Sequence, residues 1–182
     1  PQFMVNIRAP LQSNMAHTDS LTHLVERELA ATPAVKYFAS NVGKGNPRVY
    51  YNVIQQNETP DFAQVFVLLQ DDTPADEKLA LIDSLRIRFS GIPGAKIEVK
   101  NFEQGPPVLA PVEVRIFGEN IDSLRVQSAR VADLLRRTPG TLYVDDPLAN
   151  LKSDVRVDID REKASLLGIA TVDIDRTVRM AV

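Results

Sequence analysis

The sequence has no cysteine among its 182 residues. This absence excludes disulfide bonds, thiol nucleophiles and thiolate metal sites, and it is compatible with a reducing cytosol as well as with a bacterial periplasm. The chain also lacks an excess of positive charge, because 21 Lys and Arg stand against 24 Asp and Glu, for a net charge of −3. Such a balance offers no general attraction to phosphate backbones, so we expect no nucleic-acid partner.

Long hydrophobic runs are missing as well, since no stretch approaches the roughly 20 apolar residues that span a bilayer. Residues 1–3 carry neither an initiator methionine nor the charged-then-apolar pattern of a signal peptide. The sequence ends at residues 180–182 within a helical pattern, and no glycine or proline there signals the end of a helix. We therefore expect the chain to be a piece of a larger protein. Its content of 44% hydrophobic and 25% charged residues is typical of a folded globular chain.

What the sequence does contain is one pattern written three times: a strand-like run, an amphipathic helix, a proline and another strand-like run. The expected strand, helix and strand of each copy cover residues 3–7, 19–31 and 35–42, then 64–69, 75–89 and 95–102, then 112–117, 121–137 and 142–144. Side chains able to cap the helices stand at Thr18 or Asp19, Thr73 and Asn120. Each copy is a βαβ unit.

Two βαβ units in tandem make a ferredoxin-like sandwich, in which two helices cover one side of a four-stranded antiparallel sheet. We predict an α+β fold of two tandem ferredoxin-like (βαββαβ) sandwiches, of which the second lacks its last strand. The first comprises residues 1–105, a proline-rich hinge comprises 106–111, and the incomplete second comprises 112–182. In the second we further expect a strand at 155–160, a short helix at 161–167 and a helix from 172.

No arrangement of residues in the sequence favours catalysis. The carboxylates Asp145, Asp146, Asp158, Asp160 and Glu162 form the densest acidic cluster, but the basic residues beside 158–162 favour a salt-bridged surface over a metal site. His17 and His23 lack the spacing of a zinc pair, and no G-x-S-x-G elbow occurs. We therefore expect no catalytic residues, no metal site and no cofactor, and we expect that the chain is not an enzyme.

A long loop at residues 43–61 joins the first two units. Its start, Gly43-Lys44-Gly45, lacks the G-K-[ST] ending of a phosphate cradle. The loop carries Tyr50 and Tyr51 among Gly, Asn and Pro residues, and loops of this length are usually functional or disordered. The loop has two possible roles: to contact a ligand, or only to connect the two units.

The stretch 155–169, which reads V-R-V-D-I-D-R-E-K-A-S-L-L-G-I, together with V-D-I-D at 172–175, closely resembles a hallmark of the resistance-nodulation-division (RND), AcrB-like efflux transporters. Two weaker signatures agree in order: I-P-G-A at 92–95, and Q-G-P-P at 104–107 leading to V-E-V-R-I-F-G at 112–118. The resemblance covers essentially the whole chain. It implies that residues 1–105 are the first porter subdomain of the C-terminal periplasmic loop. Residues 112–182 are then an incomplete second porter subdomain that leads toward a docking insertion.

The parent implied by this resemblance is a proton-driven antiporter of the bacterial inner membrane, of which this chain is a periplasmic portion. The resemblance also implies a homotrimer that works with a periplasmic adaptor protein and an outer-membrane channel. A small-molecule substrate passes through a cleft between the porter subdomains. Proton-coupling carboxylates belong to membrane helices outside this chain.

Substrate class is inferred from the positions that match the cleft. Copper and silver exporters use a methionine cluster there, but Met4 stands alone at such a position. We therefore favour export of organic compounds such as drugs, detergents and lipophilic molecules, that is, multidrug resistance. A heavy-metal cation exporter of the same fold and a stand-alone ferredoxin-like module that binds a small regulatory ligand are the alternatives. The candidate cleft residues are Asn6, Arg8, Tyr50, Tyr51, Phe66, Phe102 and Asp145.

Overall fold

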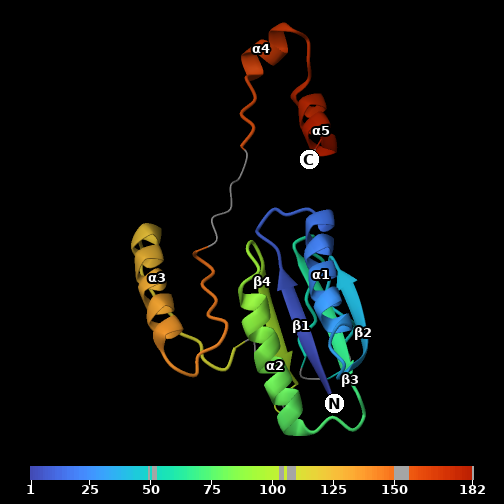
Figure 1. Ribbon diagram of the computed structural model, residues 1–182. Helices are drawn as coiled ribbons and strands as arrows, with labels where there is room; N and C mark the ends of the chain where they lie inside the picture. The colour runs from blue at the N-terminus through green and yellow to red at the C-terminus, as the bar shows by residue number, and fades with distance from the viewer. Residues whose placement is uncertain (49, 51–52, 103–104, 106–109, 150–155, 182) are drawn as a thin grey trace. The chain divides into compact units, whose positions relative to one another are not determined.

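The computed structural model describes residues 1–182 except 49, 51–52, 103–104, 106–109, 150–155 and 182 (Figure 1). The chain divides into two compact units, Pro1–Asn150 and Leu151–Val182. In the described residues no helix has the length and hydrophobicity that crossing a membrane requires. The predicted hinge at 106–111 lies largely outside the described residues, so the predicted boundary between two subdomains stays a prediction.

The first unit contains a four-stranded antiparallel sheet made of β1 (Gln2–Arg8), β2 (Val35–Val42), β3 (Phe62–Leu69) and β4 (Lys96–Asn101). The strands lie in the order β2-β3-β1-β4, so β2 and β4 form the edges. Helices α1 (Met15–Ala30) and α2 (Ala75–Ser90) connect them and cover the same face of the sheet (Figure 1). This order of elements is the βαββαβ arrangement predicted for residues 1–105.

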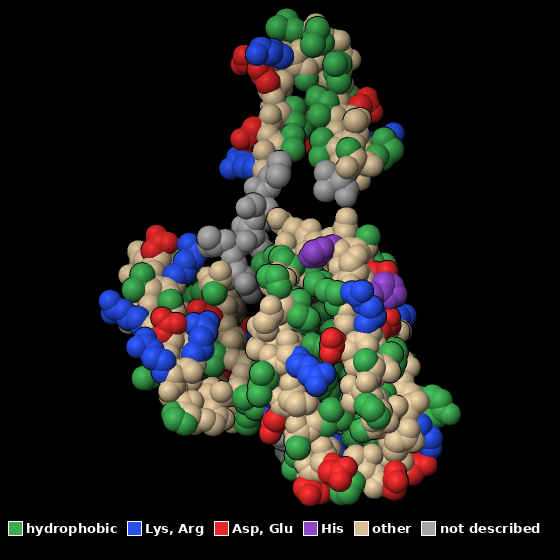
Figure 2. Space-filling view, viewed as in Figure 1, with side chains coloured by type: hydrophobic (Ala, Val, Ile, Leu, Met, Phe, Trp, Pro, Cys, Tyr) green, Lys and Arg blue, Asp and Glu red, His purple; other side chains and the backbone are tan. Residues whose placement is uncertain are grey.

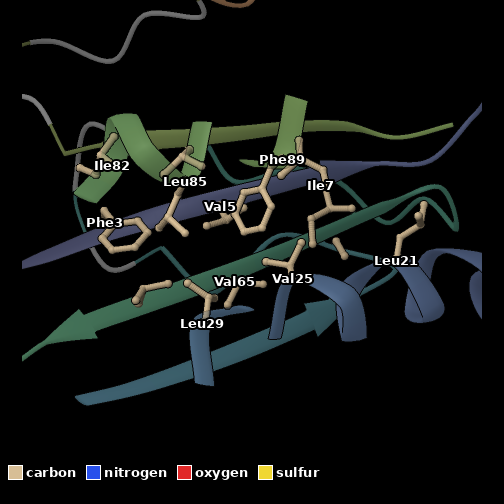
Figure 3. Close-up of a cluster of buried hydrophobic side chains, with 14 of the residues drawn as sticks. Phe3, Val5, Ile7, Leu21, Val25, Leu29, Val65, Ile82, Leu85 and Phe89 are labelled. Atoms are coloured by element: carbon tan, nitrogen blue, oxygen red, sulfur yellow. The ribbon is translucent and has the colours of Figure 1, made fainter. Parts of the chain in front are cut away.

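The core lies between this sheet and the two helices (Figure 3). Alternate residues of each strand point toward the helices, because successive side chains of a strand lie on opposite faces. The fully buried members of the cluster include Phe3, Val5 and Val65 from the strands, Val25 and Leu29 from α1, and Ile82 and Leu85 from α2. The other half of each strand's side chains therefore lies on the face of the sheet that neither helix covers, called the helix-free face below.

The helices begin where local hydrogen bonds allow, and two predicted caps were wrong. Helix α1 begins four residues early because Asn14 caps it, with the Asn14 side chain accepting a hydrogen bond from the His17 N–H at 2.9 Å. Thr18, one of the two alternative predicted caps, instead donates its hydroxyl to the Pro60 carbonyl at 2.6 Å, and Asp19, the other, lies within the helix. Helix α2 follows Pro74 and has no side-chain cap, so Thr73 does not cap it either.

The predicted second sandwich is only partly present. Helix α3 (Ile121–Arg137) forms as predicted, and the Asn120 side chain caps it by accepting from the Ser123 N–H at 2.9 Å. The runs 112–117 and 142–144 and the described residues 156–160 are not strands, so these three strand predictions were wrong. An alternating pattern decides which side chains share a face, but a strand also requires a paired backbone. None of these runs pairs with another described segment.

The second unit contains helices α4 (Arg161–Leu166) and α5 (Thr171–Ala181). The Asp160 side chain caps α4 by accepting from the Lys163 N–H at 3.1 Å. Asp158 pairs with Arg156 at 3.0 Å and Asp160 with Lys163 at 3.4 Å, which confirms the salt-bridged surface predicted for them. In the first unit, Figure 2 faces α1 and α2 and shows acidic and basic side chains interspersed, as a solvated surface requires.

Candidate functional site

Most of the predicted cleft residues come from the helix-free face of the sheet. Strand register places Met4 of β1 between Phe66 of β3 and Lys100 of β4. Two residues further along β1, on the same face, Asn6 lies between Gln64 of β3 and Glu98 of β4. Because side chains at adjacent register positions are cross-strand neighbours, the face has a mainly apolar row next to a polar row.

Three aromatic side chains meet at the apolar row. The Tyr50 and Phe102 ring centroids are 5.0 Å apart, and those of Phe66 and Phe102 are 5.7 Å apart. Both pairs are tilted, and such spacings lie in the range where aromatic rings attract one another. Tyr50, Phe66 and Phe102 form what we call the aromatic cluster. All three residues are half-buried.

A chain of amide side chains lies in the polar row. The Gln64 side chain donates from Nε2 to Asn6 Oδ1 at 2.8 Å and accepts at Oε1 from the Asn46 backbone N–H at 2.7 Å. Asn41 Nδ2 in turn donates to Asn46 Oδ1. Gln64, Asn6 and Asn46 are all buried, yet Asn46 Nδ2 has no hydrogen-bond partner. The network therefore ties the sheet to the loop that follows β2.

Glu98 is a buried carboxylate in the same row, only 7% exposed. Lys100 Nζ lies 3.0 Å and Lys96 Nζ 3.3 Å from its two oxygens. Burial is the largest single influence and raises the pKa of Glu98, but the two ammonium groups together outweigh it and hold the pKa below its ordinary value. Glu98 is therefore an ionised side chain already occupied by two cations.

Arg8 and Asp145 take part in contacts at the border of this face. The Arg8 guanidinium lies 4.9 Å from the centre of the Phe62 ring, and Arg8 Nη2 donates to Gln56 Oε1 at 3.1 Å. Asp145 Oδ1 lies 2.9 Å from Lys96 Nζ, which joins Asp145 to the charged group around Glu98. Both side chains are exposed, so these contacts orient them without burying them.

The structure thus brings together Asn6, Arg8, Tyr50, Phe66 and Phe102 on one face of the sheet, and links Asp145 to it through Lys96. Tyr51 lies outside the described residues. The role of these residues in contacting substrate stays a prediction.

Sequence reasoning missed Gln64, Asn46, Glu98 and Lys100. Alternation along residues 62–69 indicates that Gln64 shares a face with Phe66. The hydrogen-bond partner of Gln64, however, depends on how β3 is aligned with its neighbouring strands, and the sequence alone does not give that register. In the described part of the chain, no group of three or more His, Cys, Asp or Glu side chains is placed to hold a metal ion.

The chain is similar to known proteins in both sequence and fold. The sequence matches the family described as the AcrB/AcrD/AcrF family over residues 1–182. It is 29% identical over 85 residues to the nickel and cobalt resistance protein CnrA of Cupriavidus metallidurans, an overlap of 47% of this chain and 8% of that protein.

Two crystal structures of a heavy metal efflux pump are similar in fold, with TM-scores of 0.69 and 0.65 and 18% sequence identity each. They cover 98% and 94% of this chain, and the matches span 19% and 18% of those chains. At that identity the likeness is one of fold. The chain spans less than a fifth of the length of each of these relatives.

Proposed function

Since this chain belongs to the AcrB/AcrD/AcrF family of RND efflux transporters, we propose that it is a periplasmic porter region of an efflux pump. In this proposal, the helix-free face of the sheet contacts substrate on its way out of the cell. The pump works in the inner membrane as a proton-driven antiporter and a homotrimer, together with a periplasmic adaptor and an outer-membrane channel. The chain itself performs no enzymatic step and holds no cofactor.

We propose further that the substrates are organic and lipophilic. The aromatic cluster is the observation that carries this proposal, because Tyr50, Phe66 and Phe102 are half-buried aromatic side chains gathered in one place. Aromatic faces bind apolar compounds by surface burial, and a well-placed ring pair adds about 0.5–1.5 kcal/mol. Met4, the cross-strand neighbour of Phe66, is only 9% exposed, so its thioether supports the aromatic side chains and offers little surface to a ligand. The aromatic cluster itself suits apolar compounds.

A heavy-metal cation is the second candidate substrate, and the name of the curated relative favours it, since that protein confers nickel and cobalt resistance. Nickel and cobalt are bound by imidazole and carboxylate groups, and soft copper(I) by thioethers. On this face the buried carboxylate of Glu98 is already engaged by Lys96 and Lys100. A cation would have to displace those ammonium groups, so the geometry favours the organic substrate.

Binding titrations of the 182-residue chain test the proposal. The dye 1-N-phenylnaphthylamine becomes fluorescent in apolar surroundings, so its titration reports binding directly. Phe102→Ala removes the ring that both other rings contact, and we expect it to weaken dye binding roughly fivefold to tenfold, the equivalent of about 1–1.4 kcal/mol.

Phe117→Ala is the matched control, because Phe117 is 88% exposed and lies outside the cluster. We expect it to leave the dye affinity unchanged. Calorimetric titration with Ni²⁺, Co²⁺ and Cu⁺ completes the test. Tight metal binding without dye binding, or equal losses in the two phenylalanine variants, would show that the organic-substrate proposal is wrong.

A further inference from the structure

The loop between β2 and β3 is tied at its base by backbone hydrogen bonds. The Gly43 N–H donates to the Phe62 carbonyl at 2.8 Å, and the Thr59 N–H donates to the Gly43 carbonyl at 2.9 Å. The two arms of the loop approach closely at Gly45, where an added Cβ would lie 2.9 Å from the Gln56 nitrogen. These contacts involve only main-chain atoms at the base of the loop, and they do not by themselves fix the position of the residues beyond Gly45.

The next tie along the loop is made at Asn46 by two side chains: Asn41 Nδ2 donates to Asn46 Oδ1, and Gln64 holds the Asn46 main chain. Gln64 projects from β3, is 3% exposed, and accepts the Asn46 N–H at 2.7 Å. Its other end is fixed, because Gln64 Nε2 donates to Asn6 Oδ1 at 2.8 Å. A primary amide can donate and accept at once, so a single side chain joins β1 to the loop main chain. Hydrocarbon side chains of similar size can do neither.

The held residue lies close in sequence to the aromatic cluster. Asn46 is four residues before Tyr50, the loop's described contribution to that cluster, and Gln64 is two residues before Phe66 on the same face of β3. The side chain that holds Asn46 therefore lies on the same face of the sheet as Phe66, whose ring meets Phe102. Fixing Asn46 limits where Tyr50 can lie relative to Phe102.

The loop's position also carries an internal penalty. Asn46 is 9% exposed, and its Nδ2 has no partner while the loop lies against the sheet. A buried donor without a partner opposes the arrangement that buries it. The Gln64 hydrogen bond to the Asn46 N–H, called the Gln64 clamp below, is thus one of the contacts that keep Asn46 in its buried position.

We propose that Gln64 is the positioning residue that holds the β2–β3 loop so that Tyr50 closes the aromatic cluster, and that it thereby sets the access of lipophilic ligands. The effect on ligands rests on the function proposed above, whereas the effect on the loop does not. Gln64 acts through Asn46 and need not contact the ligand itself.

Amide hydrogen exchange on the ¹⁵N-labelled 182-residue chain tests the effect on the loop. Gln64→Met keeps a long unbranched side chain but removes both hydrogen bonds. We expect the exchange protection of the Asn46 N–H to fall roughly fivefold to tenfold, the loss expected for one hydrogen bond. The protection of the core Val5 N–H should change less than that of Asn46. Gln70→Met is the control, because Gln70 is an exposed glutamine directly after the same strand.

A second measurement needs no variant and decides the matter even where Gln64→Met does not fold. The clamp predicts a scalar coupling through the hydrogen bond between the Asn46 nitrogen and the Gln64 side-chain carbonyl carbon in the unsubstituted chain. Absence of that coupling, unchanged Asn46 protection in the variant, or equal losses at Asn46 and Val5 would each overturn the proposal.

Dye titration separates the clamp from the function it serves. If the unsubstituted chain binds 1-N-phenylnaphthylamine, Gln64→Met should weaken binding severalfold and Gln70→Met should not. If the unsubstituted chain binds no dye, the proposed function fails while the exchange data still judge the clamp. Weakened protection of Asn46 with unchanged dye affinity would overturn the claim that Gln64 sets ligand access.

Discussion

At the scale of single residues, Glu98 shows how a buried charge is kept on the helix-free face of the sheet. Its carboxylate has left water almost completely, and two ammonium groups at 3.0 and 3.3 Å replace the lost hydration. Removing one partner of a buried ion pair is strongly destabilising, because the remaining charge is left without compensation. Lys96 and Lys100 should therefore contribute more to the stability of the fold than lysines in exposed ion pairs do.

Lys100→Met tests this dependence. Replacement of a fully buried partner costs about 3–5 kcal/mol, but Lys100 is itself 41% exposed and Lys96 remains, so we expect the free energy of unfolding to fall by about 1 kcal/mol at pH 7. The depressed pKa of Glu98 stabilises the fold above the unfolded pKa, and this contribution is lost as the pH falls through the folded pKa.

The penalty of Lys100→Met should accordingly shrink as the pH falls through the acid range. Urea unfolding at pH 7 and at lower pH measures both values. The exposed Lys44→Met serves as the control, with little change expected at either pH. A Lys100 penalty that is equal at both pH values would contradict the assignment.

His23 on α1 provides a second residue-scale prediction. A hydrogen bond from its ring to Glu26 is the main cause that raises the pKa of His23, and the charge of Asp19 contributes next. We expect Glu26→Gln to lower the His23 pKa toward its ordinary value, and Asp19→Asn to lower it less. A proton NMR titration of the imidazole measures both changes.

The sign of the linked stability follows from the raised pKa. The contribution of His23 is fully present below the unfolded pKa and is lost as the pH rises through the folded pKa. Glu26→Gln should therefore flatten the dependence of stability on pH near neutrality. An unmoved His23 pKa in this variant would show that the Glu26 contact does not form in solution.

Single residues of the candidate site were predictable where a strand pattern fixes the face. Asn6 and Phe66 each lie between two residues of the hydrophobic core cluster, so each could be assigned to the face away from the core. The roles of Gln64 and Glu98 were not predictable, because they arise from neighbours on β1, β4 and the loop. Those neighbours are set by register and by tertiary contact, and neither is written locally in the chain.

At the scale of elements, the exposed edge of β4 is blocked by side chains. The Val99 N–H donates to the Tyr143 hydroxyl at 2.8 Å, and Arg86 Nε donates to the Val99 carbonyl at 3.1 Å. Tyr143 adopts φ of 54°, a left-handed conformation that bulky residues rarely take. Blocked backbone groups protect an edge strand from pairing with other chains.

Tyr143→Phe tests this edge contact. The variant keeps the ring but removes the oxygen that accepts from Val99, so we expect faster exchange of the Val99 amide and a loss of about 1 kcal/mol in the free energy of unfolding. Tyr37→Phe is the control, because Tyr37 is 66% exposed. Unchanged exchange at Val99 would contradict the hydrogen bond.

The elements also show where sequence patterns fail. The period of apolar residues located α2 and α3 closely, and the Asn120 cap also marked the start of α3, because these signals lie within the helix or directly beside it. The alternating run 112–117 met the same local criteria for a strand but is not one, since a strand exists only with a paired neighbour. Its Val114 and Phe117 are exposed, as expected for an unpaired run.

At the scale of the whole molecule, the described residues between 1 and 101 form the predicted βαββαβ arrangement because they contain every strand that the sandwich needs. All four strands of the sheet are present, so the apolar faces that the sequence pattern predicts for the two helices have a sheet to pack against. The family was also predictable, because the V-R-V-D-I-D-R-E-K-A signature is long and specific. Substrate class was not, since it depends on which side chains gather on the helix-free face.

The most direct test of the proposed substrate class is chemical-shift mapping on the ¹⁵N-labelled 182-residue chain. We predict that 1-N-phenylnaphthylamine shifts the amide signals of Met4, Phe66 and Lys100 on the helix-free face. The signals of Val25 and Leu85, which lie in helices on the covered face, should stay in place. Shifts produced there by Ni²⁺ or Co²⁺ and not by the dye would contradict an organic substrate and favour the metal cation.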